Sequence, residues 1–194
     1  SSDLLAENVG YDSTTVKDTL DSLLYEAINI TSFTSNVEPV QEIGTNINSI
    51  TLTWKLSQPA TEQFINDVPV TGSSFTFDTP FNSNKSFTLK VNDGTTIKSK
   101  TIDIKFMNNI YYGVSSSTTY DSNFIESLTK ELRQATEMNF RVNAGKDEYI
   151  CFAYPSHYGE AVFSVGGFEG GFREVAKFYY TNESGYNEQY IVYC

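Results

Sequence analysis

Apolar and polar residues alternate along the middle part of the chain. The alternation is clearest in three runs, at residues 50–56, 87–91 and 102–106. Successive side chains of an extended strand point to opposite faces, so a period of two predicts strands that each bury one face. The dipeptide ND at 66–67 and the tripeptide NDG at 92–94 are turn signals. The middle of the chain is therefore predicted to be β-structure.

The number and spacing of these strands predict a fold. About seven short strands fit between residues 32 and 108, with turn signals roughly every 8–12 residues. This pattern predicts an immunoglobulin-like β-sandwich over residues 32–108, without an inter-sheet disulfide. Trp54 lies in the most regular run, so we expect it in the core of the sandwich. No polar cluster converges in this segment, which we interpret as a spacer without a ligand of its own.

A helical spacing precedes the strands. Five apolar residues recur four, three, four and three positions apart: Val16, Leu20, Leu23, Ala27 and Ile30. This is the seam of a coiled coil, and it predicts a helix over residues 15–30. Two heptads are marginally stable in water, so the helix needs a partner surface. That surface is either its own domain or other copies of the chain around a symmetry axis.

The last block combines one helix with strands. An irregular connection is expected over residues 109–120, followed by a helix from about residue 122 to residue 137. The apolar face of this helix would carry Phe124, Ile125, Leu128, Leu132 and Ala135. Strands are expected at 139–143, 148–154, 160–165, 174–180 and 188–193. The predicted class is mainly β, α+β overall, with segments 1–31, 32–108 and 109–194.

Charge and composition narrow the class of protein. The chain has 24 acidic and 13 basic residues, a net charge of −11, which argues against a nucleic-acid partner. No apolar run approaches the roughly 20 residues of a membrane span, so no membrane partner is expected. Its 14 Phe and 13 Tyr residues can bury too much surface for a disordered chain.

The sequence offers few residues for metal or thiol chemistry. It has one histidine, His157, and two cysteines, Cys151 and Cys194, without a Cys/His cluster. We therefore expect no metal and no cofactor. Cys151 lies in an apolar run and is interpreted as a small buried hydrophobe, although a disulfide with Cys194 is open on parity grounds.

Catalytic motifs are not found, and the chain is predicted not to be an enzyme. Three carboxylates of the last block, Glu160, Glu169 and Glu174, are more typical of a solvated surface than of a glycosidase. The glycine-rich segment 166–172 is either a hairpin tip or a loop that a ligand can approach closely. Five residues are candidates for contact with a ligand or partner: Tyr154, His157, Tyr158, Phe168 and Phe172. Their rings either stack on sugars or pack in the core or between subunits.

Several local motifs resemble one class of protein. Residues 8–12 (NVGYD) and 19–25 (TLDSLLY) resemble a recurrent segment of bacteriophage tail-fibre and baseplate-appendage proteins, in which a short extension leads into a helix. The run 50–56 (ITLTWKL) looks like the start of a small immunoglobulin-like module. Residues 140–145 and 165–169 are similar to parts of the terminal domains of the same proteins. The resemblance implies a homotrimer with a threefold neck, in contact with other virion proteins.

The leading hypothesis is a trimeric structural module of a virion appendage, a tail fibre or similar fibre, that attaches to the host surface. Its location would be the virion, assembled in the bacterial cytoplasm, and a host-surface glycan is a candidate partner. One alternative is a carbohydrate-binding or carbohydrate-active module with an immunoglobulin-like spacer. A head fibre and a bacterial surface adhesin are the others.

Overall fold

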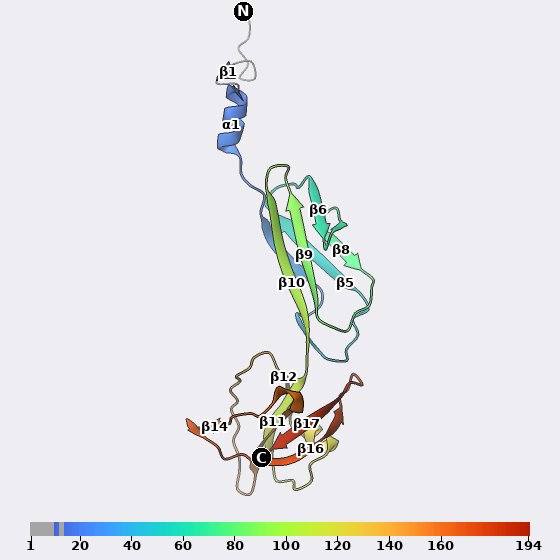
Figure 1. Ribbon diagram of the computed structural model, residues 1–194, viewed down its shortest axis with the longest axis vertical. Helices are drawn as coiled ribbons and strands as arrows, with labels where there is room; N and C mark the ends of the chain where they lie inside the picture. The colour runs from blue at the N-terminus through green and yellow to red at the C-terminus, as the bar shows by residue number, and fades with distance from the viewer. Residues whose placement is uncertain (1–9, 12–13) are drawn as a thin grey trace, which may run out of the picture. The chain divides into compact units, whose positions relative to one another are not determined.

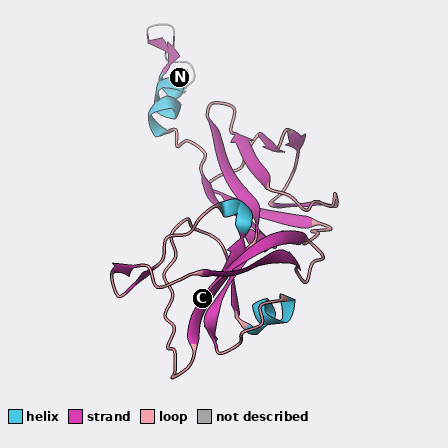
Figure 2. Cartoon of the chain, turned by 60° about the horizontal axis from the view of Figure 1, so that its bottom comes forward, coloured by secondary structure: helices cyan, strands magenta, loops and turns pink. Residues whose placement is uncertain are grey.

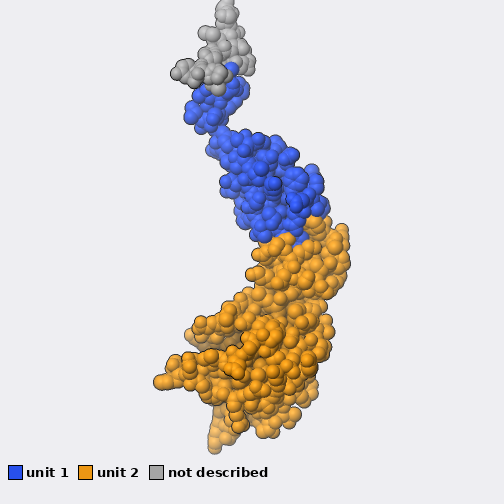
Figure 3. Space-filling view, in the orientation of Figure 1, with its two compact units in different colours: residues 1–34, 52–75, 87–101 blue, residues 35–51, 76–86, 102–194 orange. Residues whose placement is uncertain are grey.

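The computed structural model describes residues 10–11 and 14–194 and is mainly β. Several antiparallel sheets and few helices make up the chain (Figures 1 and 2), so the predicted mainly β class is confirmed. Two compact units divide it (Figure 3). The first unit contains residues 1–34, 52–75 and 87–101. The second contains residues 35–51, 76–86 and 102–194, so the units are not contiguous in sequence.

Residues 30–107, called the middle segment here, form two sheets. The first sheet has three strands: β3 (Ile30–Ser35), β5 (Ile50–Leu56) and β8 (Ser74–Phe77) in that order. The second has five, in the order β4 (Val40–Glu42), β10 (Ile97–Met107), β9 (Lys85–Asn92), β6 (Glu62–Ile65) and β7 (Val68–Pro69). The pairing of β4 with β10 is parallel, whereas β6 pairs antiparallel with both β7 and β9.

The alternation of apolar and polar residues correctly predicted strands β5 and β9 and their buried faces. In β5 the side chains of Ile50, Leu52 and Trp54 are buried, and the polar residues between them are not. Strand β9 repeats this alternation through Phe87, Leu89 and Val91. Because one face of each strand excludes water, the apolar residues must recur at every second position.

The N-terminal helix is shorter than predicted. Short strands β1 (Gly10–Tyr11) and β2 (Thr14–Thr15) pair before α1 (Val16–Leu24), which Thr15 and Asp18 cap reciprocally. The prediction that the helix reaches residue 30 was wrong: Ala27 lies in an exposed segment without helix, and Ile30 begins β3 and is buried. Ile30 therefore belongs to the core of the middle segment, because its backbone is committed to a sheet.

Asp93 holds the chain that follows the helix. Its Oδ2 accepts hydrogen bonds from the Tyr25 hydroxyl at 2.7 Å and the Ile28 backbone N–H at 3.0 Å. Its Oδ1 accepts from the backbone N–H groups of Thr95 and Thr96, at 2.9 and 2.7 Å. Donation by Thr96, Tyr25, Ile28 and Thr95 holds the pKa of the Asp93 carboxyl well below its usual range. One carboxylate thus ties the exit of α1 to the loop between β9 and β10.

Residues 109–194, the C-terminal segment, form a five-stranded sheet that carries one short helix. The strand order is β12 (Thr129–Leu132), β11 (Asn109–Ser115), β13 (Tyr149–Pro155), β17 (Asn187–Tyr193) and β16 (Glu174–Thr181), all antiparallel. Helix α2 (Ser122–Ser127) contributes the buried Phe124 and Ile125. Three tyrosines, Tyr111, Tyr180 and Tyr190, meet edge to face in the same core.

Sequence reasoning succeeded for three strands of this sheet and failed elsewhere. The strands at 149–155, 174–181 and 187–193 were predicted within one residue. The expected irregular connection is partly strand β11, and the predicted long helix ends at Ser127. Leu132 therefore lies on β12 and Ala135 is outside any helix, because residues 129–132 pair with β11. No strand forms at 139–143, a stretch that the structure describes, and only Ser164–Val165 of 160–165 is a strand.

A close contact joins the turn after β4 to the turn between β16 and β17 within the second unit. The Asn182 side-chain amide donates to the Ile43 carbonyl at 2.8 Å, and the Thr45 and Ser184 hydroxyls lie 3.2 Å apart. A Cβ added to Gly44 would lie 2.8 Å from the Tyr186 Cβ, and φ at Gly44 is +95°. Glycine is required here both by the backbone conformation and by the space.

A disulfide joins Cys151 of β13 to Cys194. Cys151 is buried, as the sequence suggested, and the pairing that parity left open is present. The two cysteines lie 43 residues apart along the sequence, and the loop between them contains β14 (Ser164–Val165), β15 (Phe168–Glu169), β16 and β17. It limits the freedom of that loop in the unfolded chain.

We predict that Asp93 makes the stability of the protein sensitive to acid. Its folded pKa lies below the ordinary value of 3.8, so the stabilisation is present above that pH and is lost as the pH falls below it. Between about pH 6 and about pH 3 the Tm of the parent should fall more than that of Asp93→Asn. Asp78→Asn, at an exposed residue, is the matched control and should keep the steeper fall of the parent. Equal slopes for parent and Asp93→Asn would contradict this role.

We predict that breaking the disulfide destabilises the C-terminal segment. Reduction or Cys194→Ser should lower the free energy of unfolding by about 2–4 kcal/mol, because the unfolded loop regains conformational freedom. Denaturant unfolding with and without reductant measures this change. Cys194→Ser is its own control, since reductant should not destabilise it further. A parent with the same unfolding midpoint in both conditions would refute the prediction.

Candidate functional site

An open hollow lies beside a short hairpin of the C-terminal segment. Its volume is about 480 Å³. It is lined by Ala144, Glu148, Tyr149, Ile150, Val165, Phe168, Glu169, Gly170, Gly171, Phe172 and Cys194. We call this the aromatic hollow, because three of its lining side chains are aromatic rings.

The hairpin that forms one wall consists of β14 (Ser164–Val165) and β15 (Phe168–Glu169), and it extends away from the main sheet (Figures 1 and 2). Gly166 and Gly167 make its turn with φ of 60° and 87°, values that favour glycine. The hairpin-tip interpretation of this segment is confirmed. The turn leaves Phe168 with 79% of its surface exposed.

Backbone and ring contacts anchor the base of the hairpin. The Gly170 N–H donates to the Phe163 carbonyl at 2.9 Å. The Phe163 and Phe172 rings stack with their centroids 4.4 Å apart, and Phe163 also meets Phe152 of β13 edge to face. Phe172 thus has a fixed position between the hollow and the body of the segment, whereas Phe168 lies at the exposed wall.

A second part of the lining comes from the start of β13. Tyr149 is 59% exposed there. The neighbouring Glu148 accepts a hydrogen bond from the Gly145 N–H at 2.7 Å through one carboxylate oxygen. Cys194 completes this wall, held by its disulfide and by two backbone hydrogen bonds with Arg173. The disulfide therefore fixes the wall on which Tyr149 and Glu148 lie.

The residues predicted as contacts divide among three places. Phe168 and Phe172 line the aromatic hollow. Tyr154 is in the core: its hydroxyl donates to the Gly159 carbonyl at 2.9 Å and its ring stacks on Tyr193. Burial raises the pKa of Tyr154 to about 12. Its prediction as a surface contact was wrong, because the inward face of β13 takes it out of reach.

His157 and Tyr158 lie in a separate polar cluster. They belong to the single-turn helix η2 (Ser156–Tyr158), and their rings lie 4.2 Å apart. His157 Nδ1 is 3.5 Å from the Glu188 carboxylate, and the Arg133 guanidinium lies over the Tyr158 ring at 4.0 Å. Neither residue lines the aromatic hollow. The Glu188 carboxylate thus lies beside one nitrogen of His157, and the Arg133 guanidinium covers one face of the Tyr158 ring.

Tyr149 and Glu148 were missed by sequence reasoning. They follow the turn at 146–147, in which Asp147 has a positive φ of 64°. Tyr149 fits the alternation of a strand and gives no local sign of exposure. Only the tertiary fold brings it into the same hollow as Phe168, about twenty residues further along.

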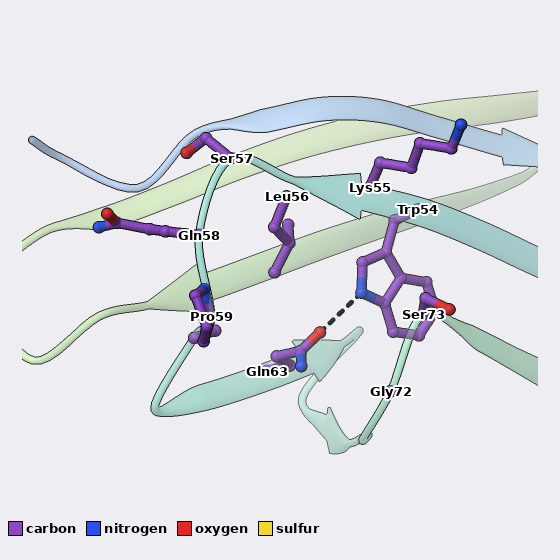
Figure 4. A pocket seen from close by; sticks show the side chains of 10 residues that line it. Trp54, Lys55, Leu56, Ser57, Gln58, Pro59, Gln63, Gly72 and Ser73 are labelled. Atoms are coloured by element: carbon purple, nitrogen blue, oxygen red, sulfur yellow. Dashed lines mark hydrogen bonds between the residues drawn. The ribbon is translucent and has the colours of Figure 1, made fainter.

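A second hollow of about 600 Å³ lies at the end of β5, next to Trp54 (Figure 4). The Trp54 indole N–H and the Gln63 side-chain oxygen point toward one another there, at 2.6 Å. The Gln58 amide donates to the Glu26 carbonyl at 2.8 Å and to Asp93 at 3.2 Å. These polar groups already have partners, and Trp54 is buried. The arrangement favours a structural role over ligand binding.

Helix α1 presents an exposed apolar surface. None of its nine residues, all of which the structure describes, is buried. Leu20 is 47% exposed and Leu23 is 76% exposed, and Val16 and Leu24 are exposed as well. Such a stripe on a helix is typical of an association surface.

Two kinds of feature are absent from the described residues. No group of three or more His, Cys, Asp or Glu side chains in this part of the chain is placed to hold a metal ion. No helix in it has the length and apolar character needed to cross a membrane. Two carboxylates, those of Glu148 and Glu169, are among the side chains that line the aromatic hollow.

Comparison with known proteins identified no relative. No protein-family model, no curated protein and no solved structure matches the chain.

Proposed function

We propose that this chain is a homotrimeric, non-enzymatic module of a bacteriophage appendage, a tail fibre or similar fibre, that contributes to host attachment. The observation that carries the proposal is the exposed apolar stripe of α1. The motifs at residues 8–12 and 19–25, which resemble the neck of such fibres, favour the same assembly. Residues 8, 9 and 12 lie outside the described residues.

The two faces of α1 support a threefold neck. Val16, Leu20 and Leu23 follow the four-three spacing of a coiled-coil seam. Lys17 and Asp21 form an ion pair at 2.6 Å among the polar residues of the helix. A nine-residue helix is marginal in water by itself, so burial of its leucines against two further copies would supply its stability.

The spacer in this proposal is an immunoglobulin-like sandwich. In chain order, strands β3 to β10 would be A, A′, B, C, C′, E, F and G. The first sheet is then A-B-E and the second A′-G-F-C-C′, a grouping that resembles that of immunoglobulin-like domains. Trp54 on strand B would be a core residue, in agreement with its burial.

The disulfide fits a protein that works on a virion outside the cell. Disulfides persist in oxidising surroundings and are rare in the reducing cytoplasm. In the proposal the chain is assembled in the bacterial cytoplasm and Cys151 and Cys194 pair after release.

A carbohydrate-binding module is the second candidate. The exposed rings of Phe168 and Tyr149 favour it, because such rings stack on the apolar faces of sugars. The two candidates are compatible if the aromatic hollow is the host-contact surface of the fibre. A monomeric chain that binds a glycan would favour the second candidate alone.

We predict that Leu23→Asp disrupts the trimer. Each buried leucine contributes about 1.5–3 kcal/mol, and a threefold axis repeats that loss in every copy while bringing three like charges together. Sedimentation velocity should therefore show mainly monomer at concentrations where the parent is trimeric. Ser22→Asp adds the same charge to the polar face of α1 and should stay trimeric. A Leu23→Asp variant that sediments like the parent would overturn the neck.

A further inference from the structure

We infer that the aromatic hollow binds an alkylammonium group, carried by a polymer of the host surface, in preference to a neutral sugar. The source of the ligand rests on the proposed function; the charge and shape of the ligand rest on the hollow itself. The lining of the hollow combines exposed aromatic rings, two carboxylates and two adjacent glycines.

The rings provide the faces that a cation needs. Phe168 and Tyr149 come from different strands and are largely exposed, and Phe172, stacked on Phe163, also lines the hollow. A cation over such a face is attracted by the ring quadrupole, and the methylene or methyl groups around it bury apolar surface. The exposure of a large phenylalanine ring to water is unfavourable, and it is relieved only when a ligand or partner covers the ring.

The charged residues of the hollow are of one sign. Glu148 and Glu169 line it, and none of its lining residues, all of them described, is Lys, Arg or His. Glu148 receives the Gly145 N–H on one oxygen, which leaves the other oxygen as an acceptor. Among the described residues no hydrogen bond or ion pair involves the Glu169 carboxylate. Two carboxylates without a cation attract a positive ligand and repel an anionic glycan.

Two adjacent glycines line the hollow and leave open space beside their backbone. Gly170 and Gly171 have φ of +105° and +86°, and a Cβ added to either would meet nothing within 4 Å. The Gly170 N–H donates to the Phe163 carbonyl, and this hydrogen bond fixes the position of the Gly170 backbone. A bulky trimethylammonium head can therefore approach the rings without displacing a side chain.

A neutral hexose is a poorer match for this lining. Sugar recognition uses both donors and acceptors, because each hydroxyl is both. Among the lining side chains only the Tyr149 hydroxyl donates, whereas the carboxylates supply acceptors alone. An ammonium or trimethylammonium group needs no donor from the protein, which makes it the better complement.

A pair of isosteric probes tests this preference on the full chain. Choline and 3,3-dimethylbutan-1-ol have the same shape and differ in charge. We expect choline to bind saturably, by NMR shifts of residues in the hollow, about tenfold or more tighter than the neutral alcohol. Equal binding of the two would show an apolar hollow without charge selection, and no binding of either would remove the site. Both results overturn the inference.

Substitutions of lining residues test whether choline binds in the aromatic hollow. Glu169→Gln and Phe168→Ser should each weaken choline binding several-fold, because each removes one attractive element of the hollow. Glu126→Gln changes the net charge equally at an exposed residue of α2 and should leave binding unchanged. If Glu126→Gln weakens choline as much as Glu169→Gln does, the attraction belongs to the overall charge and the site is wrong. Tighter binding of Nα-acetyl-lysine amide than of choline would assign the hollow to a protein partner and contradict the surface polymer.

The test separates this inference from the proposed function. Choline binding does not require the trimer, and sedimentation of the same samples reports the trimer independently. A trimeric chain that does not bind choline loses the inference and keeps the function. A monomeric chain that binds choline keeps the hollow and loses the fibre.

Discussion

In the part of the chain that the structure describes, the apolar side chains of α1 are exposed, and the proposed assembly depends on this constraint. Nine residues are too few for a stable isolated helix, and the reciprocal capping of Thr15 and Asp18 satisfies only its first turn. Immediately after the helix, Tyr25 and Ile28 are tied to Asp93. The helix is thus attached firmly at its end, yet exposed along its side. Both features suit the proposed neck that joins several copies.

The C-terminal segment shows how a small sheet can carry a protruding hairpin with exposed aromatic rings. Its tyrosine core and the Cys151–Cys194 disulfide hold β13 and the end of the chain together. The stacked Phe163 and Phe172 rings then fix the base of the hairpin on this support. The tip is free to present Phe168, because Gly166 and Gly167 allow a two-residue turn. Rigid support below and exposed rings above are what a recognition surface requires.

The sequence predicted strands correctly where a strand buries one face and exposes the other. The alternation in β5 and β9 predicted both strands, since each second residue enters the core. The four-three spacing extended the helix too far because Ile30, three positions beyond Ala27, fits the helical period by coincidence while its side chain fills the core of a sheet. Strand β11 was missed because its polar end continues into a run of serines and threonines. In the hollow, Phe168 and Phe172 were found from their glycines, but Tyr149 was not, because tertiary contact brings it there.

The mass of the unmodified full chain in solution tests the central claim most directly. Light scattering coupled to size exclusion, over a range of concentrations, reports that mass without any substitution. The account predicts three times the chain mass of 21.7 kDa, dissociating only on dilution. A chain that stays at 21.7 kDa at every concentration would contradict it, because the leucines of α1 would then remain in water.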